Sequence, residues 1–180
     1  MQKYIAFLRA INVGGHTVKM EVLRGLFEAL ELTNVETFIA SGNVIFEATD
    51  QSPRALESQI EAALHDALGY KVATFIRTPA ELAEIAQIKL FDAATLAAEG
   101  NMLYIGFVAE PPSHAAQQKL LTFNNDVDEF HVHAREIYWL CRRKFSESTF
   151  SGARLEKTLA LQTTLRNVTT VKKLAARYTP

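Results

Sequence analysis

The spacing of hydrophobic and polar positions along the chain predicts alternating strands and amphipathic helices. Residues 3–8 are apolar nearly throughout, which is typical of a central strand. Between residues 19 and 31 the apolar positions recur every three or four residues, so this segment is predicted to be a helix with one buried stripe. Residues 35–40 and 44–48 are predicted to be two strands, joined by a short hairpin at 41–43.

The next elements are marked by residues that favour helix ends. Ser52 precedes a proline and is predicted to cap a helix that Gly69 ends. Thr78, also followed by proline, is predicted to cap another helix that reaches about residue 87. Residues 72–77 between these helices are predicted to be a fourth strand. The resulting order, βαββαβ, is that of a ferredoxin-like domain.

A weakly periodic stretch at residues 89–101 is the predicted boundary between two halves, residues 1–90 and 91–180. The second half shows a βαββα pattern, with strands at 102–108, 128–133 and 136–141, a helix from Ser113 to about 123, and a helix at 151–161. Residues 163–178 close the chain with a further helix. We therefore predict an α+β fold of two ferredoxin-like (βαββαβ-type) halves in tandem with a C-terminal helix.

Topology predicts that two polar loops of the first half lie at one edge of its sheet. The first loop carries Arg9, Asn12, Gly14, Gly15, His16 and Lys19, and the second carries Ser41, Gly42 and Asn43. In this plan the first strand pairs with the third, so the loop that leaves one and the hairpin that enters the other share an edge. Two adjacent glycines allow a sharp turn with exposed N–H groups, and flanking cations favour an anion there. No GxxxxGK[ST] or GxGxxG pattern is present, and a tight βα turn without a ligand is the alternative.

Few residues have the spacing of a catalytic or metal site. His16 could act as a general base or contact a phosphate, or it could be a loop histidine with no role. His131 and His133 lie on one face of a predicted strand, but a zinc site needs three or four ligands. Neither a Ser-His-Asp set nor a carboxylate pair is evident, so we expect no metal and no cofactor, and we assign no catalytic residue.

Composition is that of an ordinary soluble globular protein of 180 residues, with 48% apolar and 22% charged residues. No apolar run approaches the ~20 residues that cross a bilayer, and no signal-peptide layout is present, so we expect no membrane association. The single cysteine, Cys141, excludes internal disulfides and is expected to be a buried thiol in a cytoplasmic protein.

Charge is distributed unevenly, although the net charge is only −1. Residues 1–141 carry a net charge of −8, whereas residues 142–180 carry +7. The basic segment could meet an anionic partner, or it could pack across the acidic body of its own chain, which its apolar spacing favours. Asn167 is expected to cap the last helix, and Arg166 could direct its guanidinium toward a phosphate or form an internal salt bridge.

Three segments together resemble the bacterial domain of unknown function 1697 family. They are FLRAINVGGHTVKM at 7–20, FIASGNVIFE at 38–47 and TTLRNVTTVKKLAARY at 163–178, with Val168 where that family usually has Trp. The resemblance implies paired ferredoxin-like halves and no established activity. It marks Arg9, Asn12, Gly14, Gly15, Met20, Ser41, Gly42, Asn43, Arg166, Asn167, Thr170 and Lys173 as matching positions.

Three hypotheses of different classes follow for the function. The leading one is a soluble protein that binds a nucleotide, phosphorylated metabolite or nucleic acid at the two loops, with Arg166, Asn167 and Lys173 as further candidate contacts. The second is an enzyme of unassigned reaction that uses His16 and Arg9. The third is a structural or interaction module that forms a homodimer through its sheets.

Overall fold

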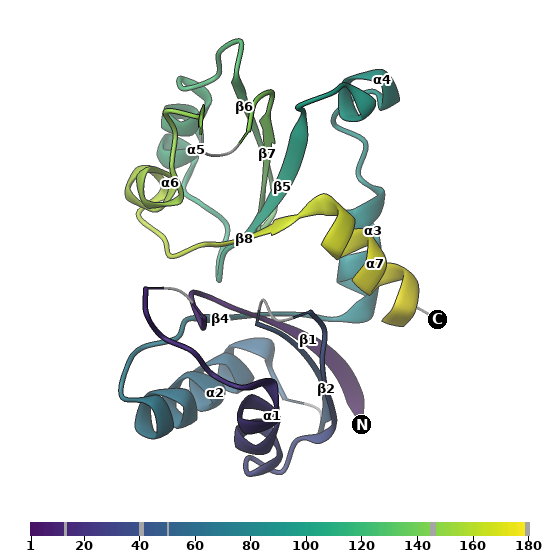
Figure 1. The fold of residues 1–180 in the computed structure, drawn as a ribbon, viewed down its shortest axis with the longest axis vertical. Coiled ribbons are helices and arrows are strands. Elements are labelled where there is room, and N and C mark those ends of the chain that lie inside the picture. The colour runs from purple at the N-terminus through teal and green to yellow at the C-terminus, as the bar shows by residue number, and fades with distance from the viewer. Residues whose placement is uncertain (13, 40–41, 50, 145–146, 179–180) are drawn as a thin grey trace. The chain divides into compact units, whose positions relative to one another are not determined.

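The computed structural model describes residues 1–12, 14–39, 42–49, 51–144 and 147–178. The chain divides into two compact units, Met1–Glu81 and the residues from Leu82 onward. This division falls within the helix α3 (Pro79–Gln87). Each unit combines an antiparallel sheet with helices (Figure 1), so the fold class is α+β, as predicted. Among the described residues, no helix has both the length and the hydropathy to cross a membrane.

The described strands of unit 1 form a four-stranded sheet with the order β2-β3-β1-β4. In chain order its elements are β1 (Gln2–Leu8), α1 (Met20–Glu28), β2 (Thr33–Thr37), β3 (Asn43–Ala48), α2 (Pro53–Leu68) and β4 (Thr74–Arg77). All neighbouring strands are antiparallel. The predicted order of elements and the predicted pairing of the first strand with the third are therefore confirmed.

Helices α1 and α2 cover one face of the unit 1 sheet (Figure 1). Leu23 and Phe27 of α1 and Ile60 of α2 are fully buried and belong to one core cluster with Phe46 of β3. The Phe27 and Phe46 rings meet edge to face at 5.6 Å. Helix α2 has the predicted ends, since the Ser52 side chain accepts a bond from the backbone and Gly69 adopts a left-handed conformation.

Strand β4 lies at an edge of the unit 1 sheet, where unpaired N–H groups would otherwise need a partner. Two carboxylates of α2 supply it: Glu61 Oε1 accepts from Thr74 N, and Glu57 Oε1 accepts from Ile76 N, each at 2.9 Å. Glu57 is only 1% exposed. The helix thus protects this edge as well as covering the face.

The described strands of unit 2 form a four-stranded sheet with the corresponding order β6-β7-β5-β8. After α3 its elements are α4 (Ala93–Ala97), β5 (Met102–Phe107), α5 (His114–Leu121), β6 (Asp128–His133), β7 (Glu136–Cys141), α6 (Gly152–Leu159), β8 (Thr164–Asn167) and α7 (Val168–Tyr178). The hairpin β6–β7 has the predicted bounds. Helix α4 and strand β8 were not predicted from the sequence, because each is too short to show a hydrophobic period. Residues 164–167, predicted as part of the last helix, form β8, and the helix begins at Val168.

An aromatic cluster forms the core between the unit 2 sheet and α5 and α6. Trp139 is fully buried, with the rings of Phe130 and Phe150 centred 5.3 and 5.4 Å away. Its indole Nε1 donates to Asp128 Oδ1 at 2.8 Å, so the buried indole N–H and the buried carboxylate are hydrogen-bonded to each other. Cys141 is buried, as predicted, and burial raises the pKa of its thiol.

Candidate functional site

The two predicted loops meet at one edge of the unit 1 sheet. Leu8 N, at the end of β1, donates to Gly42 O at 2.8 Å. Gly42 has φ +73°, and a Cβ there would lie 2.7 Å from Ile11 Cγ2, so only glycine fits this approach. The predicted convergence of the loops is therefore confirmed for Gly42. Ser41 lies outside the described residues.

The base of the loop between β1 and α1, residues 9–19 (the glycine loop), is held in place by hydrogen bonds within the loop and from Tyr70. Asn12 Oδ1 accepts from Val18 N at 2.6 Å. Tyr70 donates its hydroxyl to Ile11 O at 3.1 Å. Ile11 and Val18 are buried beneath these bonds, with exposures of 2% and 7%. Asn12 therefore acts on the loop itself, because its carboxamide oxygen is engaged by the backbone.

The tip of the glycine loop is open to solvent. Gly14 and Gly15 are exposed with φ of +67° and +87°, and no described atom lies within 4 Å of where a Cβ would stand. The imidazole of His16 is exposed and stacks on the Tyr70 ring at a centroid distance of 3.8 Å. The glycines are thus required by backbone conformation and not by crowding, and the histidine has a defined position beside them.

Charged groups of both signs surround the start of α1. Lys19 is the exposed N-cap residue, and no described side chain forms a capping bond to this helix. Lys19 forms no ion pair among the described residues. Arg9 is half-buried, and its backbone N donates to Ala73 O at 2.8 Å. Glu21 lies in the first helical turn and places a negative charge near the same N-terminus.

Asn43 has a structural role in the hairpin. It is 1% exposed, its Nδ2 donates to Phe38 O at 2.9 Å, and Phe38 N donates to Asn43 O at the same distance. These bonds close the turn that precedes β3. The carboxamide donor is therefore already engaged by the protein backbone.

Three further predicted residues belong to unit 2. Arg166 in β8 is 8% exposed, and its Nη1 donates to Thr164 Oγ1 and Leu165 O at 2.7 and 2.9 Å. Burial lowers the pKa of Arg166 to about 10, so its guanidinium remains charged at neutral pH. Asn167 Oδ1 accepts from Thr169 N at 2.8 Å, which confirms the predicted cap of α7. Lys173 is exposed on α7.

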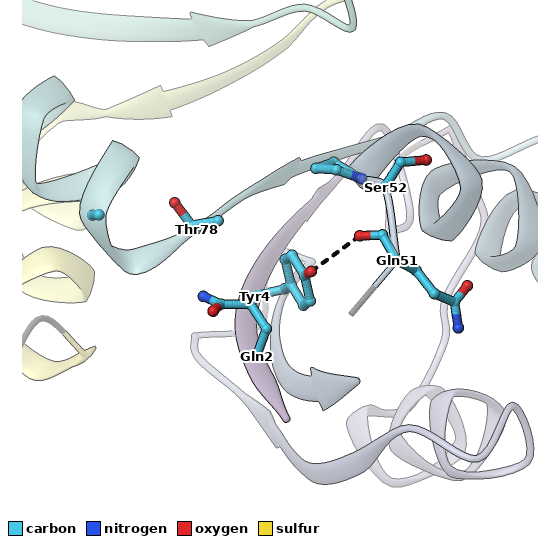
Figure 2. Close-up of a pocket in the computed structure, with 7 residues that line it drawn as sticks. Gln2, Tyr4, Gln51, Ser52 and Thr78 are labelled. Atoms are coloured by element: carbon cyan, nitrogen blue, oxygen red, sulfur yellow. Dashed lines mark hydrogen bonds between the residues drawn. The ribbon is translucent and has the colours of Figure 1, made fainter. Parts of the chain in front are cut away.

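A shallow cavity of about 490 Å³ lies at the other end of the unit 1 sheet. Figure 2 shows its lining residues Gln2, Tyr4, Gln51, Ser52 and Thr78, with the Tyr4 hydroxyl bonded to Gln51 O at 3.1 Å. Among the described residues that line it, none is a cation, a carboxylate or a histidine. The hydroxyl oxygens of Ser52 and Thr78 already cap α2 and α3. This cavity therefore offers hydrogen bonding but no acid, base or charge.

The larger cavity, of about 890 Å³, belongs to unit 2 and was missed by the sequence analysis. It is lined by residues of the segment 86–93 and by Leu96, Leu103, Tyr138 and Lys172. The segment 89–101 was predicted to be a boundary because its apolar residues lack a period. The adjacent apolar residues Leu90 and Phe91 were the available signal, but their partners come from distant strands and helices.

Of the two histidines of β6, His131 contacts neighbouring groups of unit 2, whereas His133 is exposed. His131 Nε2 lies 3.0 Å from Glu129 Oε1, and the His131 ring meets Phe91 edge to face at 5.1 Å. Glu129 also pairs with Arg142, and this hydrogen bond holds the pKa of the Glu129 carboxyl below its usual range. Within the described part of the chain, no group of three or more His, Cys, Asp or Glu residues has the arrangement of a metal site.

Comparison with known proteins supports the family suggested by the sequence motifs. The model of a family described as "Protein of unknown function (DUF1697)" matches residues 1–138. The solved structure of the conserved bacterial protein SP0830 from Streptococcus pneumoniae is similar in fold, with a TM-score of 0.70 and 21% sequence identity over 97% of each chain. None of the curated proteins matches this sequence.

Proposed function

The chain belongs to the DUF1697 family, and we propose that the loop edge of its first unit binds a small phosphate-bearing anion, such as a nucleotide or phosphorylated metabolite. The observation that carries the proposal is the meeting of the glycine loop with Gly42 directly before a helix N-terminus that no described side chain caps. Free N–H groups and the helix dipole at such a position favour a negative charge.

The Lys19 cation beside this helix start strengthens the same preference. The Lys19 ammonium is exposed and without an ion pair among the described residues, so a phosphate oxygen can approach it. His16 adds a polar ring at the loop tip, held by its stack on Tyr70. Glu21 opposes an anion and sets a limit on affinity, because its carboxylate competes for the same helix end.

The test is a titration of the protein with inorganic phosphate, AMP and ATP, followed by backbone amide chemical shifts. We expect shifts in the glycine loop and the first turn of α1, and affinity that is roughly three- to tenfold lower in Lys19→Gln. Lys3→Gln is the matched control, because Lys3 lies at the other end of β1, where it forms a half-buried pair with Glu47 at 3.6 Å. Shifts absent at millimolar ligand, or equal losses in both variants, would contradict the proposal.

A small-anion site and a nucleic-acid footprint differ in their salt dependence. A footprint on many phosphates predicts affinity that falls steeply as salt rises, because each neutralised phosphate releases counterions. For a single-stranded oligonucleotide we expect the logarithm of affinity to fall only slowly with the logarithm of salt concentration, with a slope equivalent to about one or two phosphate contacts. A steep slope would favour the nucleic-acid alternative, and light scattering of the same samples would detect a homodimer.

We also infer that both units are variants of the ferredoxin-like plan. The supporting observation is that each sheet follows the same order, with the third and first strands of the unit in the middle. A single buried cysteine is consistent with a reducing compartment, which supports a cytoplasmic location.

A further inference from the structure

The cavity of about 890 Å³ in unit 2 has the size and lining of a small-molecule pocket. Its volume of about 890 Å³ lies within the range of natural ligand sites, and all its lining residues come from Ala86 onward. The half-buried apolar side chains of Leu90, Phe91 and Leu96 form part of the lining, and Leu103 of β5 is 7% exposed. We call this cavity the α4 pocket.

Tyr138 of β7 adds apolar surface to the α4 pocket. It is 1% exposed, and its hydroxyl donates to Ile85 O at 3.2 Å, so its polar atom is already satisfied within the protein. Burial and the nearby Glu136 carboxylate raise the pKa of Tyr138, which keeps the phenol neutral at ordinary pH. The Tyr138 ring therefore forms part of the pocket wall and brings no charge to it.

Charge in the α4 pocket is concentrated on two lysines. Lys89 and Lys172 line it, and neither forms an ion pair among the described residues. The lining also includes Asp92, whose two carboxylate oxygens accept from Thr95 N and Thr95 Oγ1 at 2.7 and 2.8 Å. These bonds lower the pKa of Asp92 and commit its carboxylate to the start of α4. The lining thus has a net positive charge and two ammonium groups that can accept an anion.

We propose that the α4 pocket binds an amphipathic carboxylate, an organic acid with an aromatic or aliphatic body. The carboxylate would lie near Lys89 and Lys172, and the body would pack on Leu90, Phe91 and Leu96. A monoanion balances the charge of the lining, whereas a phosphate dianion would leave an excess negative charge beside Asp92. This site is independent of the loop edge in unit 1.

The helix beside the pocket offers a route for the ligand to enter. Helix α4 spans one turn and a half, and its described residues include none that is fully buried. An element with so little buried surface opens at low free energy. A ligand packed against Leu96 adds contacts that α4 otherwise lacks, so binding should slow amide exchange in residues 88–103.

The test compares phenylbutyrate with the neutral phenylbutanol by calorimetry and by hydrogen exchange of the full-length protein. We expect phenylbutyrate to bind more tightly and to protect residues 88–103. Lys172→Gln should weaken phenylbutyrate roughly three- to tenfold and leave phenylbutanol unchanged, because only the ion pair is lost. Phe91→Ala should weaken both compounds, because it removes the shared apolar wall.

Lys157→Gln, an exposed lysine on α6 that does not line the pocket, is the matched control and should bind as the wild type does. The Trp139 indole N–H resonance reports whether each variant keeps its core. Equal affinity for the two compounds, equal losses in the two lysine variants, or binding without protection of residues 88–103 would overturn the proposal.

Discussion

The two units share a plan but differ where their first strands end. The connection from β1 to α1 has eleven residues, 9–19, whereas that from β5 to α5 has six, 108–113. The hairpins differ in the same sense, with five residues between β2 and β3 and two between β6 and β7. In both units the chain leaving the first strand bonds to the hairpin: Leu8 N to Gly42 O at 2.8 Å, and Val108 N to Arg135 O at 3.2 Å. The fold sets this meeting point, and loop length decides how much polar surface surrounds it.

The units also correspond in strand register. Ile5 of β1 is opposite Arg77, and Ile105 of β5 is opposite Arg166. Each arginine is buried and donates from Nη1 to the carbonyl of the residue before it. To the shared plan unit 2 adds α4, the apolar segment that leads to it and the C-terminal helix α7. The candidate sites therefore lie in the parts that differ, as expected when a common scaffold supports separate sites.

The largest expected change in the free energy of unfolding comes from substituting the left-handed residue in each of the two hairpins. Gly42→Val should destabilise the protein by roughly 3–5 kcal/mol, because a side chain there is strained at φ +73° and meets Ile11 at 2.7 Å. In the hairpin of unit 2 the left-handed residue is Ala134 at φ +49°, and Ala134→Gly should be neutral or stabilise by about 1 kcal/mol. Urea unfolding measures both changes. Equal destabilisation by the two substitutions would show that the hairpins do not differ in this way.

The second-largest expected effect concerns the helix carboxylates that accept backbone N–H bonds in β4 and just before β8. Glu57→Ala should cost about 2–3 kcal/mol, because the Ile76 N–H would lose a charged acceptor inside the protein. Glu156 on α6 makes a related bond to Thr163 N at 2.8 Å, but Glu156 is half-buried, so water can replace it and Glu156→Ala should cost about 1 kcal/mol. Thermal and urea unfolding of the two variants test this order, which a larger loss in Glu156→Ala would reverse.

The smallest expected effect concerns the ion pair between Glu129 of β6 and Arg142, the residue that follows β7 in unit 2. The Arg142 bond lowers the pKa of Glu129 from its ordinary 4.5, so the pair stabilises the fold above that value. This stabilisation is lost as pH falls through the lowered pKa of the folded state. Glu129→Gln should therefore lower the free energy of unfolding by less than about 1 kcal/mol at neutral pH. It should also make the free energy of unfolding less dependent on pH below about pH 5. The comparable pair in unit 1, Lys3 with Glu47, is the control. An unchanged pH dependence would contradict the assignment.

Local sequence was sufficient where one segment carries its own physical signal. The sequence correctly predicted the helix caps at Ser52 and Asn167, the end of α2 at Gly69 and the bounds of β6 and β7. Capping side chains, positive φ and the alternation of polar and apolar residues all act within a few residues of the chain. Pattern together with topology also predicted that the glycine loop and the 41–43 hairpin converge, since antiparallel pairing of the first and third strands follows from the element order.

Tertiary structure alone decided which polar groups remain available. The sequence made Asn12 and Asn43 candidates for ligand contact and Arg166 a further one. All three side chains bond to groups of the protein, because the fold brings each beside a backbone or hydroxyl group. The hydrophobic period of the sequence also did not reveal β8, α4 or the α4 pocket. The lining of this pocket comes from segments up to 86 residues apart, from Ala86 to Lys172. A hydrophobic period records which face of one element is buried, whereas a pocket arises from the space left among several elements, and no single segment encodes that space.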